Sequence, residues 1–70
     1  AIALYQRILE QDLLAEDVYR RLIRSQLQLG LRAEAFEVYR RCRDNLSIVL
    51  GIRPSPETIA LGESIRLTKH

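Results

Sequence analysis

Apolar residues recur every three or four positions along this chain, and almost nowhere do they alternate with polar residues as they would in a strand. The first stretch with this spacing contains Leu4, Tyr5 and Ile8, and it predicts a helix over residues 1–11. β-Branched residues are scattered and form no strand-like run. The pattern therefore predicts an all-α fold.

A second helix is predicted over residues 15–29. Glu16 and Asp17 stand in its first turn, where carboxylates favour the positive end of the helix dipole. Gly30 can adopt the left-handed conformation that ends a helix. The apolar residues of this helix cover a wide arc, which predicts contact with two neighbouring helices. The arc comprises Val18, Leu22 and Leu29 on one side and Tyr19, Ile23 and Leu27 on the next.

Two further helices are predicted over residues 32–50 and 55–69. Gly51 ends the first of them, and Ser55 followed by Pro56 is typical of a helix start. Each has an apolar stripe that we expect to be buried. The stripes are Ala35, Tyr39, Cys42, Leu46, Val49 and Leu50 in the first, and Thr58, Leu61, Ile65 and Thr68 in the second.

The sequence resembles itself after a shift of 34 residues. This shift places Ala1 on Ala35 and Tyr5 on Tyr39, and it equals the period of tetratricopeptide repeats, which are helix–turn–helix units. Residues 15–48 resemble one complete repeat. The expected packing positions of the repeats are Tyr5, Tyr19, Leu22, Gly30, Ala35, Tyr39 and Cys42. The departures are Ile23 for the usual glycine, Gln26 for the usual tyrosine, and Leu13 and Ser47 at the proline positions.

A narrower resemblance covers almost the whole chain. The run LGIRPSPET at residues 50–58 has no role in a generic repeat, and with its surroundings it resembles the C-terminal part of the bacterial transcriptional activator domain. Asp12–Leu13 departs from an Asp–Pro pair that often precedes the hairpin in that family. The matching residues are Glu16, Tyr19, Arg20, Leu22, Leu29, Gly30, Glu34, Ala35, Tyr39, Leu46, Leu50, Gly51, Pro54, Thr58, Leu61 and Ile65.

The resemblance implies both an architecture and a role. It implies one tetratricopeptide-like array of about four antiparallel helices in a right-handed stack. In this array, residues 1–11 form the second helix of a preceding repeat, residues 15–50 a full hairpin and residues 55–69 a closing helix. In that family the module usually follows a winged-helix DNA-binding domain. We therefore expect a protein-interaction or self-association segment of a bacterial transcription regulator, with DNA binding in a missing N-terminal domain. The alternative is a tetratricopeptide scaffold or peptide-binding module unrelated to transcription.

The composition offers little catalytic chemistry. The chain has one cysteine, Cys42, and one histidine, His70, which is its last residue, so neither a structural zinc site nor an ordered nucleophile–base pair is expected. No glycine-rich phosphate-binding motif occurs. We expect no enzymatic activity, no cofactor and no metal. The lone cysteine fits a reducing compartment and no apolar run could span a membrane, so a cytoplasmic location is expected.

Arg20 and Arg24 are the candidate partner-binding residues. They lie one turn apart, off the apolar arc of the second helix, and guanidinium groups there could bind the carboxylates of a partner protein. In the alternative interpretation, Arg20 pairs with Glu16 one turn earlier and Arg24 is merely solvated.

Direct nucleic-acid binding by this segment is not expected. The net charge is only +2, and Arg40, Arg41 and Arg43 go round their helix instead of forming one basic stripe. The expected partners are the other domains of the regulator, a second copy of the chain, or the transcription machinery.

Two expectations concern burial. Cys42 is expected to be a buried packing residue and not a reactive thiol. The chain begins inside a helical pattern and contains no methionine, so we expect it to be a piece of a longer protein. Leu4 and Ile8 would then be left uncovered, and a homodimer could cover them.

Overall fold

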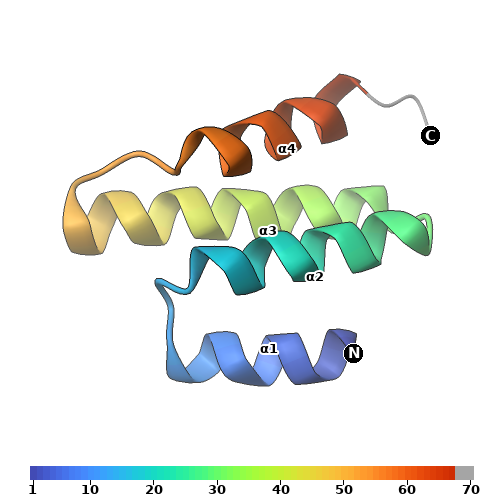
Figure 1. Ribbon diagram of the computed structural model, residues 1–70, viewed down its shortest axis with the longest axis horizontal. Coiled ribbons are helices and arrows are strands. Elements are labelled where there is room, and N and C mark those ends of the chain that lie inside the picture. Colours follow the sequence, from blue (N-terminus) through green and yellow to red (C-terminus); the bar gives the residue numbers. More distant parts are fainter. Residues whose placement is uncertain (68–70) are drawn as a thin grey trace.

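The computed structural model describes residues 1–67, and this part of the chain is all-α, with no strands. Four α-helices follow one another, and the third continues into a short π-helical turn (Figure 1). The elements are α1 (Ile2–Gln11), α2 (Glu16–Gln28), α3 (Arg32–Asn45), the π-turn η1 (Leu46–Leu50) and α4 (Pro56–Leu67). The predicted fold class is therefore confirmed. The predicted closing segment 55–69 corresponds to α4, and its last two residues, like His70, lie outside the described residues.

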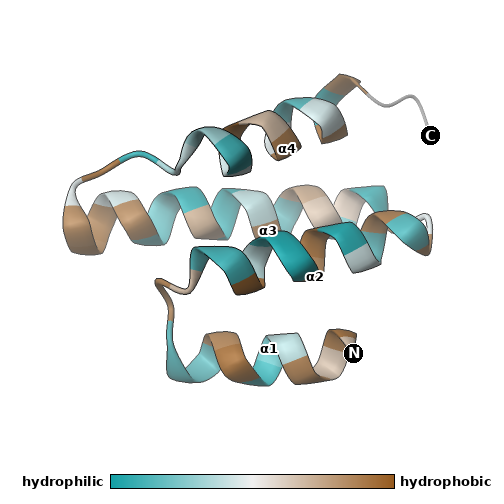
Figure 2. Cartoon of the chain, in the orientation of Figure 1, coloured by the Kyte–Doolittle hydropathy of each residue, from teal (hydrophilic) through white to brown (hydrophobic). Residues whose placement is uncertain are grey.

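Consecutive helices run antiparallel and pack side by side (Figure 1). α2 contacts both α1 and α3, as its wide apolar arc predicts, while α4 packs on α3 and touches α2. Each helix carries both apolar and polar residues (Figure 2), and apolar residues of all four helices form one core. The buried apolar residues are Leu9, Tyr19, Leu22, Ile23, Ala35, Val38, Cys42, Leu46 and Ile65. Tyr5 and Tyr39 are partly buried against this core.

Glycine ends two of the helical segments. Gly30 has φ 77° and Gly51 has φ 65°, a left-handed conformation in which a Cβ atom is disfavoured. After Gly30 the Leu31 N–H donates back to the Gln26 carbonyl at 2.8 Å, which closes α2. The tight turn then starts α3 at Arg32 and allows it to run back along α2.

We expect Gly30→Ala to lower the free energy of unfolding by about 1 kcal/mol, the cost of a left-handed L-residue. No atom lies within 4 Å of the position a Cβ would take, so the loss comes from backbone strain and not from a clash. Urea unfolding measures it. Gly30→Asn is the control and should lose less, because asparagine tolerates this conformation. An alanine variant as stable as the parent would contradict the strain.

The end of the third predicted helix differs from expectation. Residues 32–50 were expected to form one α-helix with Val49 and Leu50 on its buried stripe, but the α-helix ends at Asn45 and a π-turn follows. Val49 is 55% exposed and Leu50 52% exposed. A π-turn holds more residues per turn than an α-helix, so it rotates these two side chains off the stripe. Leu29, expected on the arc of α2, is also exposed, since α2 has ended at Gln28.

The packing of α4 on α3 depends on a glycine that the sequence pattern did not single out. Gly62 is buried in the middle of α4, and a Cβ built on it would overlap the Tyr39 ring. The ring also lies beside Phe36, with 6.1 Å between ring centroids. The two helices therefore approach closely where the tyrosine of one lies over the glycine of the other.

Candidate interaction surface

The start of α2 and the start of α4 meet at one carboxylate. Glu16 Oε2 accepts hydrogen bonds from the Ser55 backbone N–H at 2.9 Å, the Ser55 hydroxyl at 2.8 Å and the Thr58 hydroxyl at 2.6 Å. Glu16 stands in the first turn of α2 because carboxylates favour that end of a helix. Its side chain also reaches the N-terminal end of α4, where backbone N–H groups need acceptors. Glu16 thus links two helix starts that lie about forty residues apart in sequence.

Arg20 belongs to the same cluster. Its Nη1 donates to Thr58 Oγ1 at 2.9 Å and to Ser55 Oγ at 3.4 Å, and it lies 3.6 Å from Glu16 Oε2. The side chain is 17% exposed. The i,i+4 pairing that the sequence offered as an alternative is therefore present, and Arg20 holds α2 against α4. We name Glu16, Arg20, Ser55 and Thr58 the α2–α4 cluster.

The cluster lowers the pKa of Glu16 below its ordinary value of 4.5. Burial alone would raise this pKa. The hydrogen bonds from Thr58 and Ser55 and the positive charge of Arg20 stabilise the carboxylate and outweigh burial. Glu16 is therefore ionised at neutral pH, and its charge is compensated within the fold.

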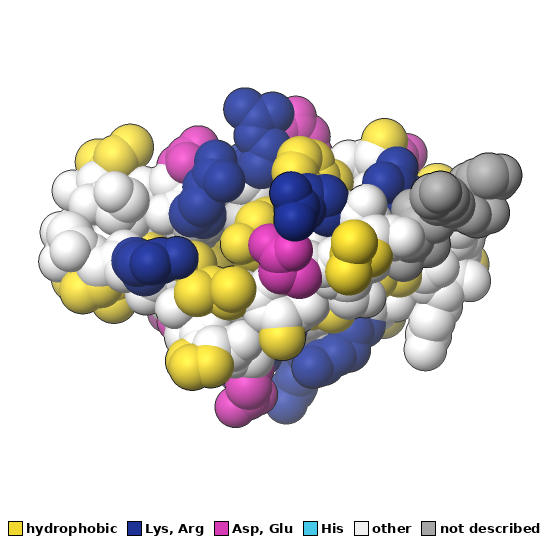
Figure 3. Space-filling model, turned by 90° about the horizontal axis from the view of Figure 1, so that it is seen from above, with side chains coloured by type: hydrophobic (Ala, Val, Ile, Leu, Met, Phe, Trp, Pro, Cys, Tyr) yellow, Lys and Arg dark blue, Asp and Glu magenta, His cyan; other side chains and the backbone are white. Residues whose placement is uncertain are grey.

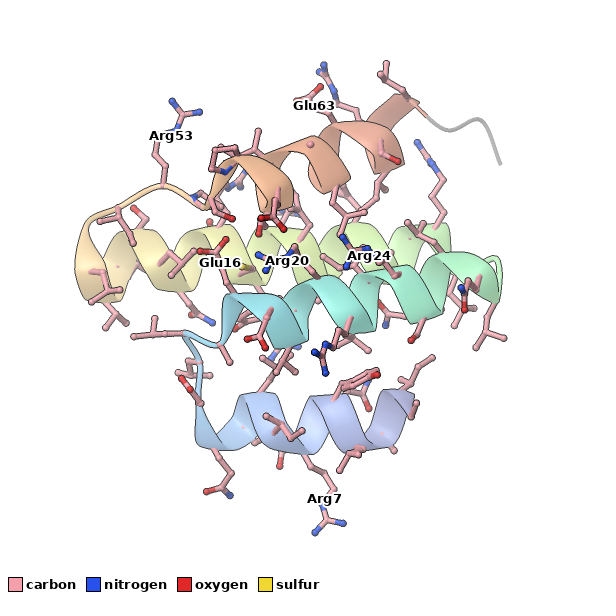
Figure 4. The ribbon with its side chains drawn as sticks, viewed as in Figure 1. Arg7, Glu16, Arg20, Arg24, Arg53 and Glu63 are labelled. Carbon is pink, nitrogen blue, oxygen red and sulfur yellow. The ribbon has the colours of Figure 1, made fainter. Side chains whose placement is uncertain are left out.

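Arg24, the second candidate, lies in different surroundings. It is exposed on α2, one turn beyond Arg20 along the edge of α2 that faces α4 (Figure 4). Neither a hydrogen bond nor an ion pair joins it to any of residues 1–67. The structure therefore places Arg20 and Arg24 on one edge of α2. Of these two residues, Arg24 is the one whose guanidinium group has no partner among residues 1–67.

Arg32 has a structural role that sequence reasoning missed. Its Nε donates to the Ile65 carbonyl at 3.0 Å and its Nη2 to the Arg66 carbonyl at 3.4 Å. A cation at a helix C-terminus satisfies free carbonyls and interacts favourably with the dipole. The sequence around Arg32 did not predict this contact, because the two carbonyl groups that accept its hydrogen bonds belong to α4.

Tyr19 ties three segments together. Its hydroxyl donates to the Leu13 carbonyl at 2.9 Å, in the turn before α2, and accepts from Asn45 Nδ2 at 2.8 Å, at the end of α3. The side chain is buried, and burial raises the pKa of the Tyr19 hydroxyl. Tyr19, at the aromatic position of the repeat, therefore connects these segments by hydrogen bonds as well as packing in the core.

Cys42 has no exposed surface in the core, and burial raises the pKa of its thiol to about 12. Residues 1–67 contain no cluster of histidine, cysteine, aspartate and glutamate that could hold a metal ion. No helix in this part of the chain is long and apolar enough to cross a membrane.

We expect the Cys42 thiol to resist alkylation in the folded protein. Burial keeps the reagent out and raises the pKa of the thiol from 9.0 to about 12, so the reactive thiolate is scarce at neutral pH. Mass spectrometry after an iodoacetamide pulse measures the reaction, and the same pulse in urea is the control. Equal labelling with and without urea would contradict the burial.

The three arginines near the end of α3 lie in different surroundings. Arg40 pairs with Glu37 at 3.4 Å and Arg43 with Asp44 at 3.5 Å. Arg41 lines a hollow between α1 and α2 on another side of the helix. These guanidinium groups form no single stripe.

By its fold, the chain is an antiparallel helical array. Cationic and apolar side chains are exposed on its surface. A family comparison is more specific: the model of the bacterial transcriptional activator domain matches residues 1–66. The chain therefore belongs to the bacterial transcriptional activator domain family, as its resemblance to that family predicted, and this places it in a bacterial transcriptional regulator. The family is regulatory and not enzymatic. Comparisons with curated proteins and with solved structures give no significant match.

Proposed function

We propose that this chain is a protein-interaction or self-association segment of a bacterial transcription regulator and that another, N-terminal domain of the regulator reads the DNA. The observation that carries the proposal is the open apolar face of α1, where Leu4 is 58% and Ile8 36% exposed. Exposed apolar surface of this kind favours contact with protein. The divided arginines of α3 give no comparable argument for a DNA groove.

Arg24 is the residue proposed to bind a partner's carboxylate. It projects from the edge of α2 beside the α2–α4 cluster (Figure 4), and Arg20 supports that edge through its bonds to α4. A guanidinium that has no partner among residues 1–67 retains its capacity for bidentate pairing. Cytoplasmic location is part of the same proposal, because transcription regulators act there.

Sedimentation velocity over a range of protein concentrations tests self-association. We expect the parent chain to shift toward a dimer with rising concentration and the Leu4→Lys, Ile8→Lys double variant to remain monomeric. Ala3→Lys is the control, since Ala3 is also exposed on α1 but lies off the Leu4–Ile8 stripe.

DNA binding is tested with the same preparations by anisotropy of labelled duplexes at increasing salt. We expect weak, sequence-independent binding that falls steeply with salt, as contacts to phosphate alone do. Tight, sequence-selective binding by this chain would reject the proposed division of labour. A strict monomer that captures no other domain of the regulator would reject the interaction role.

A further inference from the structure

A groove follows the outer seam between α3 and α4. It consists of two hollows of about 490 and 270 Å³. Phe36 lines the first and Tyr39 the second, and the centroids of their rings lie 6.1 Å apart. We name it the α3–α4 groove. The first hollow is lined by Arg32, Ala33, Phe36, Glu37, Arg40 and Arg66, and the second by Tyr39, Arg43, Asp44, Ser47, Ile52, Arg53, Pro54 and Ile59.

A hollow between α1 and α2 is the repeat-related counterpart of this groove. On the α1 side it is lined by four residues, and a shift of 34 carries every one of them onto a residue of the α3–α4 groove. The pairs are Gln6 and Arg40, Leu9 and Arg43, Glu10 and Asp44, and Leu13 and Ser47. The two hollows therefore occupy equivalent places in successive repeats.

The two hollows differ in whether a further helix forms their far wall. In the α1–α2 hollow, α3 forms the far wall and contributes Val38 and Arg41. Among residues 1–67, only α3, η1, α4 and the loop before α4 line the α3–α4 groove, so no further helix forms an equivalent wall there. The position that α3 takes beside the α1–α2 hollow therefore suits a helix that directs an apolar side chain, here Val38, toward the hollow.

The charge of the groove indicates the chemistry of that helix. Five arginines line the α3–α4 groove. Arg40, Arg43 and Arg66 are paired with Glu37, Asp44 and Glu63, so Arg32 and Arg53 are the two that have no carboxylate partner among residues 1–67. The α1–α2 hollow, by contrast, has one arginine and one glutamate. Arg53 projects from the loop before α4 (Figure 4) and has no ion pair with any of residues 1–67. Viewed onto α4, arginine and apolar side chains lie next to one another (Figure 3). An occupant with glutamate or aspartate at its edges would complement this surface.

Two other occupants fit less well. Nucleic acid would place phosphates against Glu37 and Asp44, and it would leave the apolar Phe36, Tyr39 and Ile59 without a partner. A second copy of this chain offers α1 as its open apolar helix. That helix carries one arginine and one glutamate, so it brings no excess of negative charge.

We propose that the α3–α4 groove docks an acidic amphipathic helix of a partner protein, in the place that α3 takes beside α1 and α2. The inference rests on the proposed interaction role and specifies its surface and its partner chemistry. The helix would place apolar residues over Tyr39 and Ile59 and carboxylates beside Arg43 and Arg53.

A fluorescein-labelled designed helical peptide tests this inference, with leucine along one face and glutamate on both flanks. Anisotropy measures its binding to the parent chain, to the Arg43→Glu, Arg53→Glu double variant, and to Arg7→Glu. Arg7 is the matched control, since it is exposed on α1 and directed away from α4 (Figure 4). We expect the double variant to bind at least about tenfold more weakly and Arg7→Glu to bind as the parent does. Thermal melts establish that all three chains are folded.

Further measurements separate this inference from the proposed function. The same peptide with glutamine in place of glutamate should bind more weakly than the glutamate peptide, and amide shifts in NMR spectra should map to α3 and α4. Equal binding of both peptides, no binding of either, displacement of the peptide by duplex DNA, or a concentration-dependent dimer that buries the groove would each overturn the inference. Loss of binding with Arg24→Glu but not with the double variant would also overturn it and would leave the proposed function standing.

Discussion

Replacing Glu16 with alanine is expected to lower the free energy of unfolding by roughly 3 kcal/mol. The substitution removes the acceptor of three hydrogen bonds from Ser55 and Thr58. Among the carboxylates near Arg20, it leaves only Glu57, which lies 3.8 Å away and is 75% exposed. A core of this size provides only about 3–5 kcal/mol in total, so we expect the variant to be largely unfolded at physiological temperature.

Glu34→Ala is the matched control. Glu34 is also a first-turn carboxylate, on α3, but it is exposed and makes none of the contacts of the α2–α4 cluster. Its loss should cost only the dipole term of about 0.5 kcal/mol. Urea unfolding followed by circular dichroism measures both variants. Similar losses for Glu16→Ala and Glu34→Ala would show that the cluster adds nothing beyond helix-end electrostatics.

The lowered pKa of Glu16 predicts how the stability of the protein changes with pH. The folded-state pKa of Glu16 lies below the ordinary value of 4.5, so its stabilisation is fully present above that value. Protonation removes the stabilisation as the pH falls through the lower, folded-state pKa. The stability difference between the parent and Glu16→Gln should therefore shrink on acidification below about pH 4.5. A difference that does not change with pH would contradict the assignment.

Gly62→Ala is expected to destabilise the protein by about 1 kcal/mol, although alanine is the better helix former. In the interior of an open helix this substitution would gain about 1 kcal/mol. Here the new Cβ would overlap the Tyr39 ring, and overpacking of this kind costs about 1–3 kcal/mol. The ring is partly buried and lies beside Phe36, so it cannot move away without losing its own contacts.

A double-mutant cycle isolates this contact. Tyr39→Ala removes the ring, and in that background Gly62→Ala should become stabilising, because only the helix propensity remains. Thermal or urea unfolding of the four chains gives the coupling free energy. If Gly62→Ala stabilised the parent chain, the close approach of α3 and α4 at this position would be wrong.

The Arg20 and Arg24 pair shows how far sequence reasoning reached at the candidate site. Helical spacing correctly placed both on one edge of α2 and offered Glu16 as a partner for Arg20. It did not supply Ser55 and Thr58, which complete the cluster from a helix about forty residues away. These partners depend on how α4 lies across α2, and periodicity carries no information about that.

The sequence by itself determined the features that depend on neighbouring residues. Apolar spacing set the four helices, and Gly30 and Gly51 set two of the places where a helical segment ends, because helical hydrogen bonds and side-chain periodicity act within a few residues. The 34-residue shift related α1 to α3 because the same residue pattern recurs in both. Only the tertiary structure decided the contacts of Glu16 with Ser55 and Thr58, the contact of Arg32 with the last turn of α4 and the fit of Tyr39 over Gly62. It also decided the π-turn that exposes Val49 and Leu50. These features depend on the distance and angle between packed helices, which arise from the summed contacts of the core and are not encoded in any one stretch of the chain.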